Sequence, residues 1–66
     1  MNKMWQVWQS LTEFSDVVVV GSDDEAPDEE RYGFMASFYD REMANAVALD
    51  AAMIATLLFD REEYET

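Results

Sequence analysis

Between residues 3 and 15, apolar and polar positions recur with a spacing close to the period of an α-helix. Five apolar residues fall on one helix face: Met4, Val7, Trp8, Leu11 and Phe14. Five polar residues fill the opposite arc: Lys3, Gln6, Gln9, Ser10 and Glu13. The pattern predicts an N-terminal amphipathic helix. A strand over Met4–Leu11 is the alternative, favoured by the β-propensity of Trp and Val, although Gln9 would then share a face with Trp5 and Val7.

Two later segments have the patterns of β-strands. Val17–Val20 is a run of four β-branched residues, which predicts a strand. Tyr32–Tyr39 alternates with a period of two and predicts a second strand. A helix starting at Pro27 is the alternative there, because Pro followed by acidic residues is typical of a first helical turn, but Gly33 disfavours it. The connecting segment 21–30 is too long for a tight hairpin turn.

The last third of the chain predicts a long helix. Asp40 is a good N-cap residue, and neither Gly nor Pro occurs from Arg41 to Thr66. At 100° per residue, four apolar residues share the face expected to pack on the core: Val47, Ala51, Ile54 and Leu58. A second apolar stripe lies on the side expected to be wet: Leu49, Met53 and Leu57. The sequence leaves open whether this second stripe is an interface for a partner or for a second copy.

Together these elements predict an α+β domain with an N-terminal amphipathic helix, a short antiparallel sheet and a long C-terminal helix. The alternative fold is a three-stranded antiparallel sheet followed by one helix. At 66 residues the chain forms one domain (1–66) with a small core and no cysteine to staple it. Seven large apolar residues are expected inside: Met4, Trp5, Val7, Trp8, Phe14, Phe34 and Phe38.

Charge changes this picture most. Fifteen residues are Asp or Glu and four are Lys or Arg, which gives a formal net charge of -11. Solubility of a small domain requires a net charge of only about 2 to 8, and a larger imbalance makes the compact state repel itself. The excess predicts a basic partner. Adaptation to high salt is the alternative explanation of the same composition.

The residues exclude most catalytic chemistry. There is no His or Cys, which removes the usual nucleophile and base pairs, and two glycines are too few for a phosphate-binding loop. A calcium loop of the EF-hand type needs Asp or Asn at position 5 and Gly at position 6, where Pro27 and Asp28 stand when counting from Asp23. We therefore expect a protein that is not an enzyme, with no metal site and no cofactor.

The acidic residues concentrate in two segments. The first run contains Asp23, Asp24, Glu25, Asp28, Glu29 and Glu30, and the second contains Asp60, Glu62, Glu63 and Glu65, with Glu42 and Asp50 on the helix between them. In an extended backbone, the first run would place a carboxylate about every 4 Å, close to the ~3.4 Å phosphate spacing along one DNA strand. These twelve residues are the predicted partner-binding acidic surface.

In size, charge and missing catalytic residues, the chain resembles the small acidic inhibitors encoded by bacteriophages, including DNA-mimicking anti-restriction and anti-CRISPR proteins. The resemblance implies that the acidic residues replace phosphates on a basic, nucleic-acid-binding protein or complex, without direct binding to nucleic acid. A homodimer through the second stripe is compatible with this function. The apolar stretch Met43–Phe59 is 17 residues long and interrupted by Asp50, which is short for a membrane span. We expect a soluble protein of the cytoplasm, or of the host cytoplasm if phage-encoded.

Overall fold

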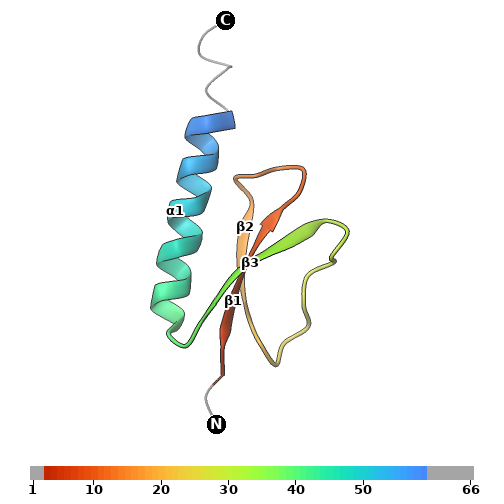
Figure 1. The fold of residues 1–66 in the computed structure, drawn as a ribbon, viewed down its shortest axis with the longest axis vertical. Helices are drawn as coiled ribbons and strands as arrows, with labels where there is room; N and C mark the ends of the chain where they lie inside the picture. The colour runs from red at the N-terminus through yellow and green to blue at the C-terminus, as the bar shows by residue number, and fades with distance from the viewer. Residues whose placement is uncertain (1–2, 60–66) are drawn as a thin grey trace, which may run out of the picture.

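The computed structural model describes residues 3–59, which form a three-stranded antiparallel sheet followed by one helix. The elements in chain order are β1 (Trp5–Ser10), β2 (Val17–Gly21), β3 (Tyr32–Phe38) and α1 (Arg41–Phe59) (Figure 1). The α+β class is confirmed in the form of the alternative fold. The predicted N-terminal helix is wrong, because that segment is the central strand of the sheet.

The misleading spacing in β1 has a physical cause. The strand order is β2-β1-β3, and β1 is covered on both faces, so it needs apolar residues on both. Val7 is completely buried under α1, and its neighbour Trp8 is 7% exposed on the other face. Gln9 does share a face with Trp5 and Val7, and its Nε2 donates a hydrogen bond to the carbonyl oxygen of Phe14 at 2.7 Å. The side-chain amide of Gln9 therefore has a hydrogen-bond partner, although the sequence pattern disfavoured a polar residue on this face.

β1 pairs with both neighbours in a defined register. Val7 lies opposite Val19 of β2 and Ala36 of β3. The pairing with β3 slips at the next position, because Trp8 lies opposite Phe34, so Met35 is the extra residue of a β-bulge. The bulge allows Phe34 and Ala36, two residues apart, to lie on different faces: Ala36 pairs with Val7 on the side of α1, whereas Phe34 meets Trp8 edge to face at 5.5 Å between ring centroids.

α1 begins where the sequence predicted it. The Oδ1 atom of Asp40 accepts a hydrogen bond from the Glu42 N–H at 2.9 Å, and the Asp40 carbonyl accepts one from Ala44 N–H, which confirms Asp40 as the N-cap. The buried face of the helix differs from the prediction. It is made of small side chains, namely Ala44, Ala48 and Ala55.

The predicted core face of α1 is therefore wrong in part. Val47 and Ala51 are half-buried, but Ile54 is 55% exposed and Leu58 is 59% exposed. The helix is turned by about 70° from the expected orientation, judged at 100° per residue. Small residues at the contact let the helix backbone approach the sheet closely, where Val7 packs with Ala44 and Ala48 among Trp5, Val17, Val19 and Phe38. Of the seven residues expected inside, Phe14 and Phe34 are exposed.

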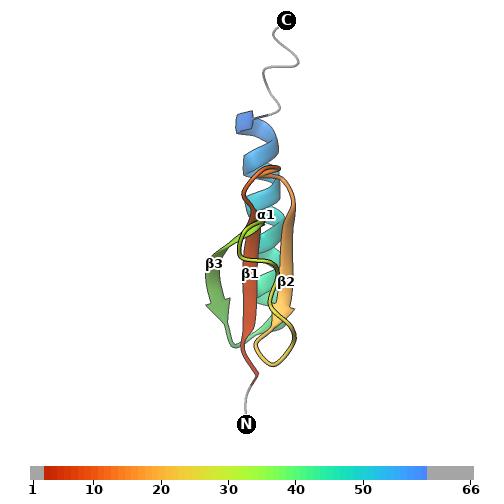
Figure 2. The same ribbon diagram turned by 90° about the vertical axis from the view of Figure 1, so that its right-hand side faces the viewer.

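The connection between β2 and β3, residues 22–31, forms the third layer of the molecule. Because β1 lies between the strands that it joins, this segment must cross β1 over one face of the sheet. α1 contacts all three strands on the opposite face, and the crossover passes over the face that α1 leaves open (Figures 1 and 2). The sheet thus has an apolar helix on one side and the acidic segment on the other.

Candidate interaction surfaces

The acidic crossover, residues 22–31, presents six carboxylates on the side of the sheet away from α1. All six acidic residues are exposed: Asp23, Asp24, Glu25, Asp28, Glu29 and Glu30. Pro27 is half-buried in the middle of the segment, and Arg31 at its end is its one basic residue. The segment therefore presents a strongly negative surface to solvent.

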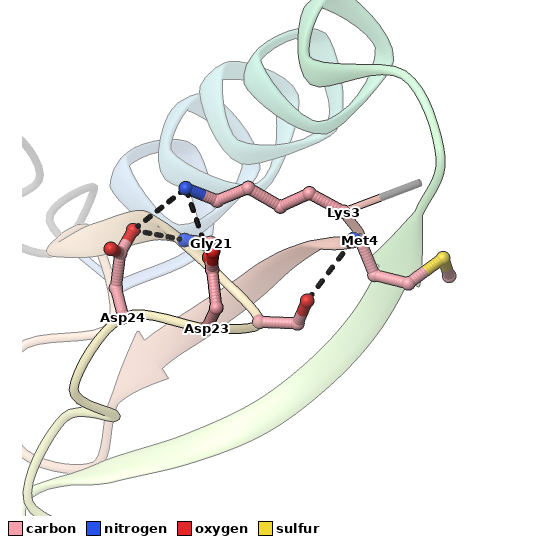
Figure 3. A network of polar contacts seen from close by, with 6 residues as sticks. Lys3, Met4, Gly21, Asp23 and Asp24 are labelled. Atoms are coloured by element: carbon pink, nitrogen blue, oxygen red, sulfur yellow. Dashed lines mark hydrogen bonds and ion pairs between the residues drawn. The ribbon is translucent and has the colours of Figure 1, made fainter. Parts of the chain in front are cut away.

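The start of the crossover is held by the lysine that precedes β1. Lys3 Nζ lies 3.0 Å from Asp23 Oδ1 and 3.4 Å from Asp24 Oδ2 (Figure 3). The hydrogen bond from Lys3 lowers the pKa of Asp23, and the same bond raises the pKa of Lys3 against a smaller opposing effect of desolvation. The ammonium group also lies 4.7 Å from the centroid of the Trp5 ring. One lysine thus attaches the crossover to the start of the central strand.

Backbone contacts reinforce this attachment. Ser22 N–H donates to the Met4 carbonyl at 2.8 Å, and Met4 N–H donates to Ser22 Oγ at 3.1 Å. Gly21 N–H donates to Asp24 Oδ2 at 3.2 Å (Figure 3). A Cβ atom at Gly21 would collide with Lys3 Cε and lie 2.6 Å from Asp24 Oδ2, so glycine leaves the room that this cluster occupies.

The far end of the crossover is attached beside β1 by a hydrogen bond of 2.8 Å from Leu11 N–H to the Arg31 carbonyl. The turn before Arg31 is closed by Asp28. Its Oδ1 accepts a hydrogen bond from Glu30 N–H at 2.9 Å, and its carbonyl accepts from the N–H groups of Arg31 and Tyr32. Tyr32 then donates its hydroxyl to Asp16 Oδ2 at 2.6 Å. This hydrogen bond is the main cause of the raised pKa of Tyr32. The crossover is consequently attached at both ends.

These contacts correct the predicted spacing of charges. Residues 21–24 and 28–31 form turns, and residues 25–27 between them have no regular structure, so the run is not one extended strand with evenly spaced carboxylates. Asp23, Asp24 and Asp28 accept hydrogen bonds or ion pairs within the protein, which leaves Glu25, Glu29 and Glu30 without such contacts among residues 3–59. The sequence did not single out Lys3 as an anchor, although it is the only lysine of the chain.

The other predicted acidic residues do not join this surface in the described part of the chain. Glu42 and Asp50 are exposed on α1, on the opposite side of the sheet. Asp60, Glu62, Glu63 and Glu65 lie outside the described residues. The acidic surface that can be described is therefore the crossover alone.

A polar hollow of ≈ 320 Å³ adjoins the far end of the crossover. It is lined by Ser10, Thr12, Glu13, Asp16, Arg31 and Tyr32. Ser10 Oγ accepts hydrogen bonds from the N–H groups of Thr12 and Glu13, so part of this lining holds the β1–β2 turn. Within residues 3–59, no three Asp or Glu side chains are gathered closely enough to share a metal ion. The hollow continues the polar character of the crossover side.

The second candidate surface is the apolar helix face, the outward side of α1. The predicted stripe lies on it, with Leu49 64%, Met53 56% and Leu57 67% exposed. Met43 and Ile54 flank this stripe and are also more than half exposed. Leu58 and Phe59 are exposed too, but they lie on the side of the sheet, where the Phe59 ring meets Phe14 at 4.6 Å between centroids. By length and composition, α1 is also long and apolar enough to cross a membrane, a criterion that core helices of soluble proteins meet as well. This face has far more exposed apolar surface than the prediction of a single stripe implied.

The chain matches no protein family model, no curated protein and no solved structure. Its function has to be argued from the two surfaces.

Proposed function

We propose that this chain is a non-enzymatic binding protein that blocks a nucleic-acid-binding partner by placing carboxylates where the partner would bind DNA phosphates. The observation that supports this proposal is the acidic crossover: six exposed acidic residues on a segment attached at both ends. A basic groove that releases counterions on binding phosphates can accept carboxylates in the same positions. The field of such a surface also accelerates the encounter with a basic partner.

The attachment of the crossover strengthens this argument. A flexible acidic tail loses conformational freedom when it binds, and this loss reduces its affinity. Here Lys3 holds one end, and the hydrogen bond from Leu11 N–H to the Arg31 carbonyl holds the other, before any partner binds. The ordering cost on binding is accordingly smaller, as expected for a shaped surface.

The distribution of charge disfavours adaptation to high salt as the sole explanation. Such adaptation spreads acidic residues over the whole surface, whereas the outward side of α1 exposes five large apolar side chains and only two acids, Glu42 and Asp50. Among residues 3–59, six of the eleven acidic residues lie on the crossover. A role as a structural or oligomerising protein is the second candidate function, favoured by the apolar helix face.

The test compares two variants of equal net charge. One replaces the three crossover carboxylates that make no internal contact (Glu25→Gln, Glu29→Gln, Glu30→Gln), and the control replaces three exposed acids elsewhere (Glu13→Gln, Glu42→Gln, Asp50→Asn). Each protein is immobilised and exposed to a nuclease-treated bacterial lysate, and retained proteins are eluted with a 20-base-pair duplex, a length chosen at about two helical turns.

We expect retained proteins to be released by the duplex and to bind much less when salt rises from about 50 to 200 mM. The crossover variant should lose about tenfold or more in affinity, and the control should stay within about threefold. The proposal would be contradicted if neither higher salt nor the duplex released the retained proteins. It would also be contradicted if retention fell equally in the two variants.

A further inference from the structure

The apolar helix face has the properties of an interface between two copies of this chain. The monomer has a small interior: within residues 3–59 the one large side chain that is fully buried is Val7, and the remaining buried apolar residues are Trp8 and three alanines. Seven large apolar side chains of α1 remain more than half exposed, and five of them lie on its outward side: Met43, Leu49, Met53, Ile54 and Leu57. Soluble monomers rarely expose so large a contiguous apolar patch, and domains of this size without disulfides or metals gain stability by association.

The area of this face fits a dimer. Each large apolar side chain removes on the order of 100 Å² from water when covered, so the five on the outward side of α1 supply on the order of 500 Å² per copy. A stable interface of standard size buries about 800 Å² per partner. The helix alone therefore provides most of the area that a specific dimer needs.

We propose that α1 pairs with α1 of a second copy, antiparallel, about a twofold axis beside Met53. Ala46, Leu49, Met53 and Leu57 follow one line along the outward side of the helix at spacings of three and four residues, which is the spacing of a helix–helix seam. Antiparallel pairing places Leu49 against Leu57 of the second copy. Every contact is then matched by its symmetric equivalent, as a closed dimer requires.

Charge decides the direction of the pair. In a parallel pair, Asp50 would lie beside Asp50 of the second copy, where like charges repel. Antiparallel pairing about Met53 separates these two carboxylates by about 9 Å along the axis, at 1.5 Å per residue. It also aligns the two helix dipoles favourably.

The position of the acidic crossover limits the electrostatic repulsion between two copies, although each chain has a formal net charge of -11. The crossover lies across the sheet from α1, so the two strongest negative surfaces face away from each other in the dimer (Figures 1 and 2). A membrane is a poorer occupant, because anionic lipids repel this chain and the outward side of α1 lacks the Lys and Arg residues of interfacial helices.

Sedimentation velocity at about 10 and 100 μM and at 50 and 500 mM salt tests the proposal. We expect a dimer that tightens a few-fold at the higher salt, because screening reduces repulsion between the copies. The variant Leu49→Gln, Met53→Gln, Leu57→Gln should be monomeric. The control Glu25→Gln, Glu29→Gln, Glu30→Gln should remain a dimer, and this inference holds whether or not the crossover binds a basic partner.

A second measurement keeps the test decisive if the polar variant fails to fold. The chain contains no cysteine, so single cysteines report proximity cleanly. Met53→Cys should form a disulfide-linked dimer rapidly on oxidation, and Ser15→Cys, in the exposed β1–β2 turn, should not. A monomer at all concentrations, an assembly larger than a dimer, equal crosslinking at both positions, or a monomer that binds phosphatidylcholine vesicles would overturn the proposal.

Discussion

The two sides of the sheet differ in how they use their side chains. On the side of α1, the fully buried contacts are made by alanines, and five of the seven exposed large apolar residues of the helix lie on its outward side. On the side of the crossover, a polar segment is held by hydrogen bonds and an ion pair while six acidic residues remain exposed. The comparison shows that, in a domain this small, the most apolar segment does not have to supply the interior.

The two surfaces should also respond oppositely to salt. Binding through carboxylates weakens as ions screen the attraction, whereas association through the apolar helix face strengthens as ions screen the repulsion between chains. Salt therefore separates the two activities without any mutation. If both proposals hold, each dimer presents two acidic surfaces facing away from each other, and each surface engages its own partner.

The largest expected effect tests the close contact on the helix side. Ala44 is completely buried against the sheet, so Ala44→Leu should overpack the interface and destabilise the fold by about 3 kcal/mol. Asn45→Leu is the control, because Asn45 is exposed on the same helix and is not part of the proposed seam, and its effect on folding should stay within about 0.5 kcal/mol. Urea denaturation measures both. Equal stability of the two variants would show that α1 does not pack through its alanines.

A smaller effect is expected on the crossover side from Tyr32→Phe, which removes the 2.6 Å hydrogen bond to Asp16. We predict a fall in melting temperature of a few degrees at pH 7. Because this bond raises the pKa of Tyr32, its stabilisation is complete below the ordinary value of 10.0 and is lost as the pH rises through the higher folded value. The difference in melting temperature between wild type and Tyr32→Phe should therefore disappear as the pH rises above 10.0.

The control for this change is Tyr39→Phe, which removes a hydroxyl from an exposed ring just outside β3. It should leave the melting temperature unchanged. A gap between wild type and Tyr32→Phe that stays constant as the pH rises past 10.0 would mean that the hydrogen bond to Asp16 does not stabilise this end of the crossover.

The smallest effect is expected from Lys3→Gln, because ion pairs between exposed side chains contribute little to stability. The sharper signal is the carboxyl titration of Asp23, followed by NMR. The wild-type pKa lies below 3.8, since Lys3 stabilises the carboxylate, and it should move back toward 3.8 in the variant. The carboxylate's contribution to stability is present above pH 3.8 and is lost as the pH falls through the lowered folded value.

Lys3 contributes in the opposite pH range. Its raised pKa means that its stabilisation is complete below 10.5 and is lost as the pH rises through the folded value. Arg41→Gln is the matched control, because Arg41 lies 5.0 Å from the Trp5 ring and makes no ion pair with Asp23. If the pKa of Asp23 is the same in the wild type, Lys3→Gln and Arg41→Gln, then Lys3 does not anchor the crossover.

Much of the secondary structure was predictable because its signals are local. The β-branched run at Val17–Val20, the alternation in Tyr32–Tyr39 and the N-cap at Asp40 each describe an element by its own residues, and all three are confirmed. β1 was not predictable in this way. This strand packs against α1 on one face and against the crossover on the other. It therefore has apolar residues on both faces, and its sequence lacks the apolar–polar alternation of a half-exposed strand.

The candidate surfaces were predictable only in outline. The acidic run and the stripe of Leu49, Met53 and Leu57 could be read from the sequence, and both are exposed in the structure. The anchoring by Lys3 could not be predicted, because its partner Asp23 is far away in the sequence. The neighbouring hydrogen bond between Met4 and Ser22 likewise joins residues 18 positions apart. Such contacts depend on the β1–β2 pairing, which brings residue 3 beside residue 23.

By itself, the sequence determined that this protein is a small, strongly acidic α+β domain without nucleophilic histidine or cysteine chemistry, and it located the strands and helix whose signals are local. The tertiary structure decided which side of α1 faces the sheet and which side of the sheet the acidic segment crosses. Both outcomes depend on how closely two elements can approach. Small alanines permit a short distance between helix and sheet, and the central position of β1 forces the crossover onto the face that the helix leaves open.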